Sequence, residues 1–124
     1  MLCPVEKTPM LVLELQGVEI DYCTQCGGIW LDAGELGLLL DNEAAAGRMM
    51  SQLQPSSSKG RRLRCPVCGK RMQAVDVGGV TIDRCQRGHG LWFDRGELAG
   101  VIRHGSLDPN NKVSAYLDDM FREG

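Results

Sequence analysis

The sequence predicts a small α+β fold built from two consecutive copies of one unit, and three observations lead to this fold class. Residues 65–98 match residues 3–36 at a constant offset of 62 positions, with no gap. Each copy carries cysteines in closely spaced positions. The length of 124 residues leaves room for one modest domain or two very small ones.

The repeat preserves residues with distinct structural roles. Cysteine, glycine, tryptophan and acidic positions recur together, so the same local structure is expected twice. The matched pairs are Cys3-Pro4-Val5 with Cys65-Pro66-Val67, Gly17-Val18 with Gly79-Val80, Ile20-Asp21 with Ile82-Asp83, Cys23 with Cys85, and Gly28, Trp30, Asp32, Gly34, Glu35 and Leu36 with Gly90, Trp92, Asp94, Gly96, Glu97 and Leu98.

The second copy contains a complete set of metal-ligating residues. Cys65 and Cys68 form a C-x-x-C pair on a turn, and Cys85 and His89 follow an apolar hairpin. Two ligand pairs separated by roughly 15–20 residues are typical of a structural zinc site, which four sulfur or nitrogen ligands close into a tetrahedron. A unit of about 60 residues buries too little surface to be stable unaided, so such a metal staple is expected.

Disulfides are the alternative to metal binding. Met1 and Leu2 run directly into Cys3, which leaves no room for a signal peptide. A cytoplasmic location is therefore expected, and disulfides are rare there. No apolar run approaches the length of a transmembrane span. Iron is the alternative metal, because Cys65 to Gly69 also resembles a rubredoxin knuckle, but a histidine ligand favours zinc.

The first copy offers a less complete site. Residues 10–15 and 18–22 are predicted to form a hairpin that presents Cys23 and Cys26 opposite Cys3. Glu6 stands at the position equivalent to Cys68, and a carboxylate can bind zinc, so Cys3, Glu6, Cys23 and Cys26 form a possible ligand set. Alternatively Glu6 is solvated and the fourth ligand is water, an outside group or His104. We expect two zinc ions per chain, the second more tightly bound.

The segment from Cys23 to Leu36, CTQCGGIWLDAGEL, resembles the zinc-finger family related to transcription factor IIB. Members are small prokaryotic proteins that often carry CPxC and CxxCGGxWLDxGEL in one or two copies. The resemblance covers residues 3–36 and 65–98. It implies a zinc ribbon followed by a helix in each copy. The metal ligands it implies are Cys65, Cys68, Cys85 and His89 in the second copy, and Cys3, Cys23 and Cys26 in the first.

The last residues of each copy are predicted to begin a helix. Asp32 to Glu35 and Asp94 to Glu97 both fit a capping box, in which the two side chains satisfy unpaired backbone N–H groups. A catalytic carboxylate pair is the alternative reading. The first helix is predicted to run from Asp32 to about Leu53, a shorter one to end near His104, and a last one to span residues 113–122. Trp30 and Trp92 are expected in the core, rather than exposed as platforms for stacking bases.

Composition divides the chain into four parts. These are a first ribbon with its helix (1–53), a flexible basic linker (54–64), a second ribbon with a short helix (65–105), and a C-terminal turn and helix (106–124). Residues 1–54 carry a net charge of −6 (2 basic, 8 acidic), and residues 55–104 carry +6 (10 basic, 4 acidic). A basic segment of this kind can contact phosphates. Its candidate residues are Lys59, Arg61, Arg62, Arg64, Lys70 and Arg71.

These features predict a zinc-binding, non-enzymatic adaptor that binds protein or nucleic acid. A role related to transcription is what the resemblance to the zinc-finger family implies. The apolar helices favour a protein partner, and the basic half favours nucleic acid. A metal-handling protein or a zinc enzyme that uses the incomplete first site is the alternative. Catalysis there has little support, because no general base lies near in sequence beyond Glu6 itself. No small-molecule substrate is indicated.

Overall fold

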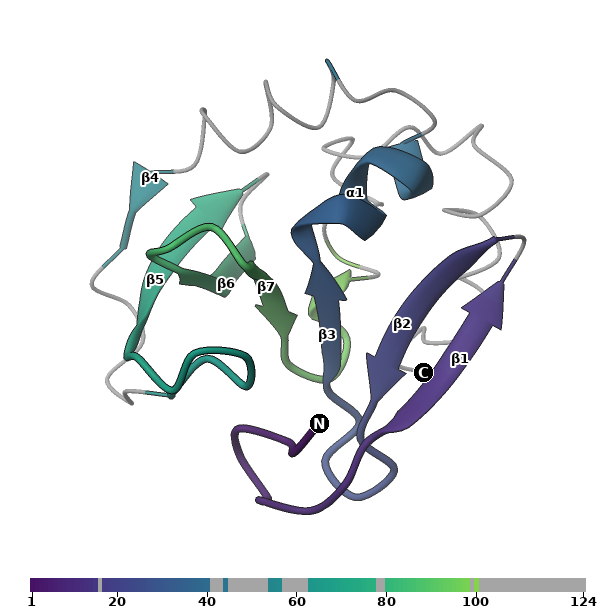
Figure 1. Ribbon diagram of the computed structural model, residues 1–124. Helices are drawn as coiled ribbons and strands as arrows, with labels where there is room; N and C mark the ends of the chain where they lie inside the picture. The colour runs from purple at the N-terminus through teal and green to yellow at the C-terminus, as the bar shows by residue number, and fades with distance from the viewer. Residues whose placement is uncertain are drawn as a thin grey trace.

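The computed structural model describes residues 1–15, 17–40, 44, 54–56, 63–77, 80–98 and 100. Within these residues the chain forms strands that all join one sheet, together with a short helix (Figure 1). The elements are β1 (Leu11–Leu15), β2 (Val18–Tyr22), β3 (Ile29–Asp32), α1 (Ala33–Leu40), β4 (Gln54–Pro55), β5 (Met72–Val77), β6 (Val80–Cys85) and β7 (Gly90–Phe93).

Each repeat contributes an antiparallel three-stranded unit. In the first repeat the hairpin of β1 and β2 continues into β3, and in the second the hairpin of β5 and β6 continues into β7. The hairpins have equivalent registers, since Leu15 pairs with Val18 and Val77 pairs with Val80. Gly17 has a φ of 85°, as the tight turn between the first two strands requires. The predicted hairpin of the first copy is therefore confirmed.

The two repeats are joined edge to edge into a single sheet of order β1-β2-β3-β7-β6-β5-β4. The joint is the antiparallel pair of β3 and β7, in which Trp30 lies opposite Trp92 and Leu31 lies opposite Leu91. Because equivalent tryptophans of the two repeats face each other, the joint has a local two-fold character. Figure 1 shows the two strands side by side in the middle of the molecule.

Two glycines make this joint possible. A Cβ atom on Gly28 would overlap the ring of Trp92, and a Cβ atom on Gly90 would lie 2.8 Å from Cζ2 of Trp30. Each repeat thus has a glycine, without a side chain, at the position against which the tryptophan of the other repeat packs. The two contacts are reciprocal, as the two-fold character of the joint requires.

The core lies on both sides of this central pair of strands. The residues of β7 are buried at every position and those of β3 at its first three, because central strands are covered on both faces. Helix α1 contacts β2, β3 and β7. On one side a single buried cluster contains both tryptophans and the cysteines of both repeats. Its buried members are Cys3, Met10, Cys23, Trp30, Cys65, Met72, Cys85 and Trp92.

The start of the linker differs from the sequence prediction, whereas the predicted end of the first helix is not tested by the described residues. Helix α1 is described only as far as Leu40, and Ala44 is also helical, whereas the predicted end at Leu53 lies outside the described residues. Gln54 and Pro55, predicted to begin a flexible linker, instead form β4 against Asp76 and Val75. The backbone groups on the outer edge of β5 would be unpaired without β4, so they are available to pair with Gln54 and Pro55. The composition of residues 54–55 does not reveal this pairing.

The expected helix after the second copy is not supported in the described part of the chain. Glu97, Leu98 and Gly100 have helical conformation, but no second helix is formed within the described residues. Within the described residues a helix after the ribbon is therefore supported for the first copy, and the rest of the second predicted helix, as far as His104, lies outside them. The predicted last helix, residues 113–122, lies outside the described residues. Among the helical residues that are described, none belongs to a helix long and apolar enough to cross a membrane.

Candidate metal centres

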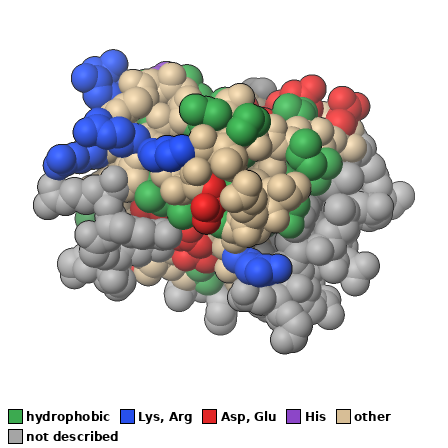
Figure 2. Space-filling model, turned by 90° about the horizontal axis from the view of Figure 1, so that it is seen from below, with side chains coloured by type: hydrophobic (Ala, Val, Ile, Leu, Met, Phe, Trp, Pro, Cys, Tyr) green, Lys and Arg blue, Asp and Glu red, His purple; other side chains and the backbone are tan. Residues whose placement is uncertain are grey.

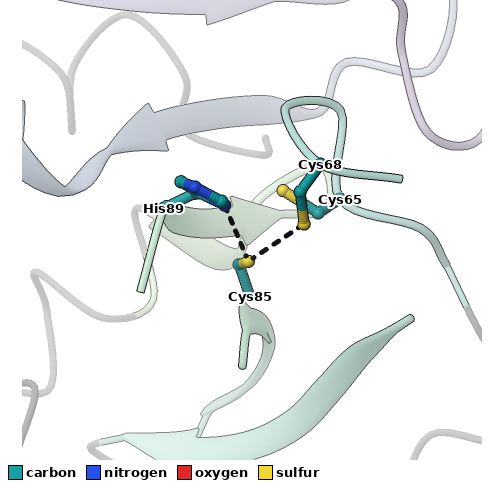
Figure 3. A group of neighbouring side chains, drawn as sticks. All are labelled: Cys65, Cys68, Cys85 and His89. Carbon is teal, nitrogen blue, oxygen red and sulfur yellow. Dashed lines mark hydrogen bonds between the residues drawn. The ribbon is translucent and has the colours of Figure 1, made fainter. Parts of the chain in front are cut away.

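The second repeat brings its four predicted ligands together. Cys65 and Cys68 come from the turn before β5, Cys85 ends β6, and His89 lies just before β7. All four ligand atoms lie within 4.8 Å of one another. Figure 3 shows the side chains converging, with Cys85 Sγ 3.7 Å from Cys68 Sγ and 3.3 Å from His89 Nδ1.

These distances fit a tetrahedral metal site. Zinc–sulfur bonds of about 2.3 Å at tetrahedral angles place two sulfur atoms about 3.8 Å apart. The Cys68–Cys85 distance agrees with this spacing and is far longer than a disulfide bond of about 2.05 Å. All six cysteines of the chain are free thiols. Three sulfurs and one imidazole nitrogen form a donor set that suits zinc, as a closed four-ligand site.

Backbone hydrogen bonds hold the turn that carries Cys65. The Gly69 N–H donates to the Cys65 carbonyl at 2.9 Å, and the Cys65 N–H donates to the Lys70 carbonyl at 2.8 Å. Gly69 has a φ of 73°, which favours glycine. The Val67 N–H points at Cys65 Sγ, 3.3 Å away, where it stabilises a thiolate. These local contacts orient the Cys65 side chain toward the other ligands of the cluster.

Two thiols of each cluster have pKa values displaced from that of a free cysteine. Burial raises the pKa of Cys65 to about 11 and that of Cys26 to about 12. Burial also opposes ionisation of Cys85, but hydrogen bonds from the backbone N–H groups of His89 and Arg87 lower its pKa to about 6. The pKa of Cys23 is lowered in the same way, because the backbone N–H groups of Cys26 and Gln25 outweigh its burial. A bound divalent cation would keep the remaining thiols ionised.

The first repeat brings together the three predicted cysteines. The Sγ atoms of Cys3, Cys23 and Cys26 lie within 4.8 Å of one another, and those of Cys3 and Cys26 are 3.6 Å apart. This spacing again fits zinc–thiolate geometry. Thr8 Oγ1 lies 4.0 Å from Cys23 Sγ. Cys3 and Cys23 are buried, whereas Cys26 is half-buried.

The knuckle that carries Glu6 has the same backbone as its counterpart in the second repeat. The Lys7 N–H donates to the Cys3 carbonyl at 2.9 Å, as Gly69 does to Cys65. The Glu6 N–H points at Cys3 Sγ, 3.3 Å away. The Glu6 side chain is exposed, and its carboxylate is not among the three gathered ligand atoms. Glu6 as fourth ligand therefore stays a prediction, and its alternative, His104, lies outside the described residues.

The tryptophan and acidic residues after each cluster interact in a way that the motif did not reveal. The indole N–H of Trp30 donates to Asp32 Oδ1 at 2.9 Å, and that of Trp92 donates to Asp94 Oδ1 at 3.1 Å. Both rings are fully buried, so the core role predicted for them is confirmed and a base-stacking platform is excluded. The spacing of tryptophan and aspartate in W-x-D could have predicted this hydrogen bond, because residues i and i+2 of a strand share a face.

The two glutamates of these tails differ in their partners. Glu97 Oε1 accepts the Asp94 N–H at 2.8 Å, which is half of the predicted capping box. Glu35 Oε2 instead accepts the N–H of Glu19 on β2, at 2.9 Å. Both carboxylates thus stabilise backbone groups. The bonds support a structural role over the catalytic carboxylate pair.

One comparison with known proteins gives a match. A family model described as a transcription factor zinc-finger matches residues 2–42 and 64–104. No curated protein and no solved structure matches the chain. Each matched segment contains one of the two metal clusters and one of the two tryptophans.

Proposed function

Because the chain belongs to the transcription factor zinc-finger family and has two zinc sites, we propose that it is a zinc-stabilised adaptor without enzymatic activity. In this proposal the second repeat contacts the phosphates of a nucleic acid. The second site already has four protein ligands, which is the arrangement of a structural zinc rather than a catalytic one. Six free cysteines suit a reducing compartment such as the cytoplasm.

The observation that carries this proposal is a group of exposed cations on and beside the second knuckle, the turn that carries Cys65 and Cys68. Arg64, Lys70, Arg71 and Arg87 are all exposed. Arg64 and Arg71 are paired across an isolated bridge, which sets them side by side next to the zinc cluster. Figure 2 shows several Lys and Arg side chains at the end of this face that lies on the side of β4 and β5, and acidic side chains both near its middle and at its other end. Lys59, Arg61 and Arg62 lie outside the described residues.

The expected mode of binding is contact with phosphates rather than recognition of bases. Among the described residues, both tryptophans and Phe93 are buried, so they cannot stack on bases. A charged knuckle held by zinc offers fixed cations to a polyanion. Binding should therefore depend strongly on salt and weakly on nucleotide sequence.

Fluorescence anisotropy of labelled generic DNA and RNA tests the proposal with the zinc-loaded full chain. If three or four cations contact phosphates, the slope of log K against log salt concentration should be about −3 to −4 for duplex DNA. Lys70→Gln and Arg71→Gln should each weaken binding and reduce the slope by about 1. Lys7→Gln, on the corresponding knuckle of the first repeat, is the matched control and should change neither. Equal effects of Lys7→Gln and Lys70→Gln would argue against the proposal.

A metal-handling role is the second candidate, and the first cluster favours it specifically. This cluster gathers three ligand atoms, whereas the second gathers four. A zinc ion with an open fourth position exchanges more readily than one that is enclosed. Isotopically labelled zinc should then exchange into the first site faster than into the second site. Equal exchange at both sites would remove this candidate.

A further inference from the structure

The two repeats differ in whether a further strand covers the outer edge of their hairpin. On the second repeat, the outer edge of β5 is covered by β4, and the Ser56 N–H donates to the Ala74 carbonyl at 2.9 Å. Strand β1 is the equivalent of β5 in the first repeat. Within the described residues, no strand covers the outer edge of β1.

The equivalence identifies which backbone groups of β1 face outward. Ala74 and Asp76 of β5 correspond to Val12 and Glu14 of β1, and the hairpins of the two repeats have the same register. Since the Ala74 carbonyl accepts a bond from the covering segment, the backbone N–H and C=O groups of Val12 face away from β2. The same alternation turns the backbone of Glu14 outward.

The sequence of β1 does not protect this edge. Natural edge strands are commonly shortened or carry proline or lysine, which prevents pairing with other chains. The β4 edge has both a length of two residues and a proline. In contrast, β1 reads LVLEL, and the side chains of Leu11 and Val12 are 54% and 63% exposed. Such an edge is suited to pairing with an added strand.

The charges around β1 define the partner. Glu14 lies opposite Glu19 on β2, and both side chains are exposed on the same face of the sheet. Glu35 accepts the Glu19 N–H, which brings a third carboxylate close. From Met1 to Leu40 the sequence has six acidic residues and a single basic one, Lys7. A strand added here would meet carboxylates on one face and Leu11 on the other.

We propose that the outer edge of β1 binds an extended basic peptide of a partner protein, as an added antiparallel or parallel strand with alternating basic and apolar residues. This site lies at the opposite end of the sheet from the cationic knuckle, and it goes beyond the proposed contact with nucleic acid. A second copy of the chain fits the edge less well. Pairing of β1 with itself would place the Glu14 carboxylates of two copies on neighbouring strands.

A lysine–valine heptapeptide with blocked ends, KVKVKVK, is a suitable probe, and EVEVEVE is its acidic counterpart. Anisotropy of the labelled peptides with the zinc-loaded full chain should show binding of the basic peptide only. The same peptide should slow hydrogen exchange of the Val12 and Glu14 amides, because these would enter a new strand ladder.

Two variants locate the site. Val12→Pro removes an outward-facing N–H without disturbing the bonds to β2, so it should reduce peptide affinity at least tenfold while two zinc ions remain bound. Glu14→Gln should weaken binding by several-fold, whereas Asp76→Asn, its equivalent on β5, should leave affinity unchanged. Unaltered affinity in Val12→Pro, or equal binding of the acidic peptide, would overturn the proposal. Dimerisation seen by sedimentation and abolished by Val12→Pro would also overturn it, in favour of a second copy.

Discussion

At the level of single residues, the two metal clusters differ by one ligand on an otherwise shared scaffold. Glu6 occupies the position of Cys68, while the backbone of both knuckles is held by the same hydrogen bonds. The residue types and their spacing were enough to predict which four residues gather in the second cluster and which three cysteines gather in the first. The orientation of a side chain on an exposed turn is set by solvent and by the metal, so the role of Glu6 was beyond prediction from the pattern.

Substitutions at Glu6 should reveal whether it is a ligand. Glu6→Cys restores a fourth thiolate, and we expect it to tighten zinc binding at the first site by tenfold or more, about 1.4 kcal/mol. Glu6→Ala should weaken binding if the carboxylate coordinates zinc. Competition with a chelator measures both effects, and unchanged affinity in Glu6→Ala would assign the fourth position to another group.

Lys7 holds a conformation that favours glycine. Its φ is 61°, whereas the equivalent residue in the second repeat is Gly69, with a φ of 73°. A left-handed conformation costs a residue with a Cβ atom about 1–2 kcal/mol. Lys7→Gly should therefore raise the free energy of unfolding, by up to about 1 kcal/mol after the greater chain entropy of glycine in the unfolded state is included. Chemical denaturation of the zinc-loaded chain measures the change, and destabilisation would show that the Lys7 side chain contributes contacts.

At the level of elements, the hairpins were predictable and the joint between the repeats was not. Apolar strands that flank a glycine turn form a local pattern, and this pattern predicted the hairpin of residues 10–15 and 18–22. Strands β3 and β7 are short and buried on both faces, so they lack the alternation that marks a strand. Their pairing is also a long-range contact. Strand β4 was missed because a proline and serines resemble a linker.

The reciprocal packing of glycine and tryptophan makes a specific prediction about this joint. Gly28→Ala and Gly90→Ala should each destabilise the chain by about 1–3 kcal/mol, because an added methyl group would collide with the tryptophan of the other repeat or with backbone. Gly34→Ala is the control. It has open space around its Cβ position and lies in α1, so it should be neutral or slightly stabilising. Thermal unfolding compares the three, and equal effects would contradict the packing described for the joint.

At the level of the whole molecule, one sheet connects two zinc sites and two ends of opposite charge. Because β3 and β7 are paired, neither repeat is an independent unit. The basic end is proposed to meet nucleic acid, and the acidic end a basic strand. An adaptor of this kind requires that the zinc ions hold the shared sheet together.

Loss of one ligand of the second site should therefore affect both repeats. Structural zinc contributes roughly 10–16 kcal/mol in small fingers, which is comparable to or larger than the whole stability of a domain, about 5–15 kcal/mol. Cys85→Ser should unfold the second repeat and broaden the amide signals of β3 as well, because β3 loses its partner strand. A two-dimensional amide spectrum checks this outcome. Native dispersion in the second repeat without metal would exclude a structural role for its zinc.

Native mass spectrometry of the full chain tests most directly the claim that two zinc sites hold this fold. We expect a chain with two zinc ions and six reduced cysteines, and we expect it to unfold when a strong chelator removes both ions. A folded chain with one metal ion or none, or a mass reduced by the hydrogens lost in disulfide formation, would contradict it.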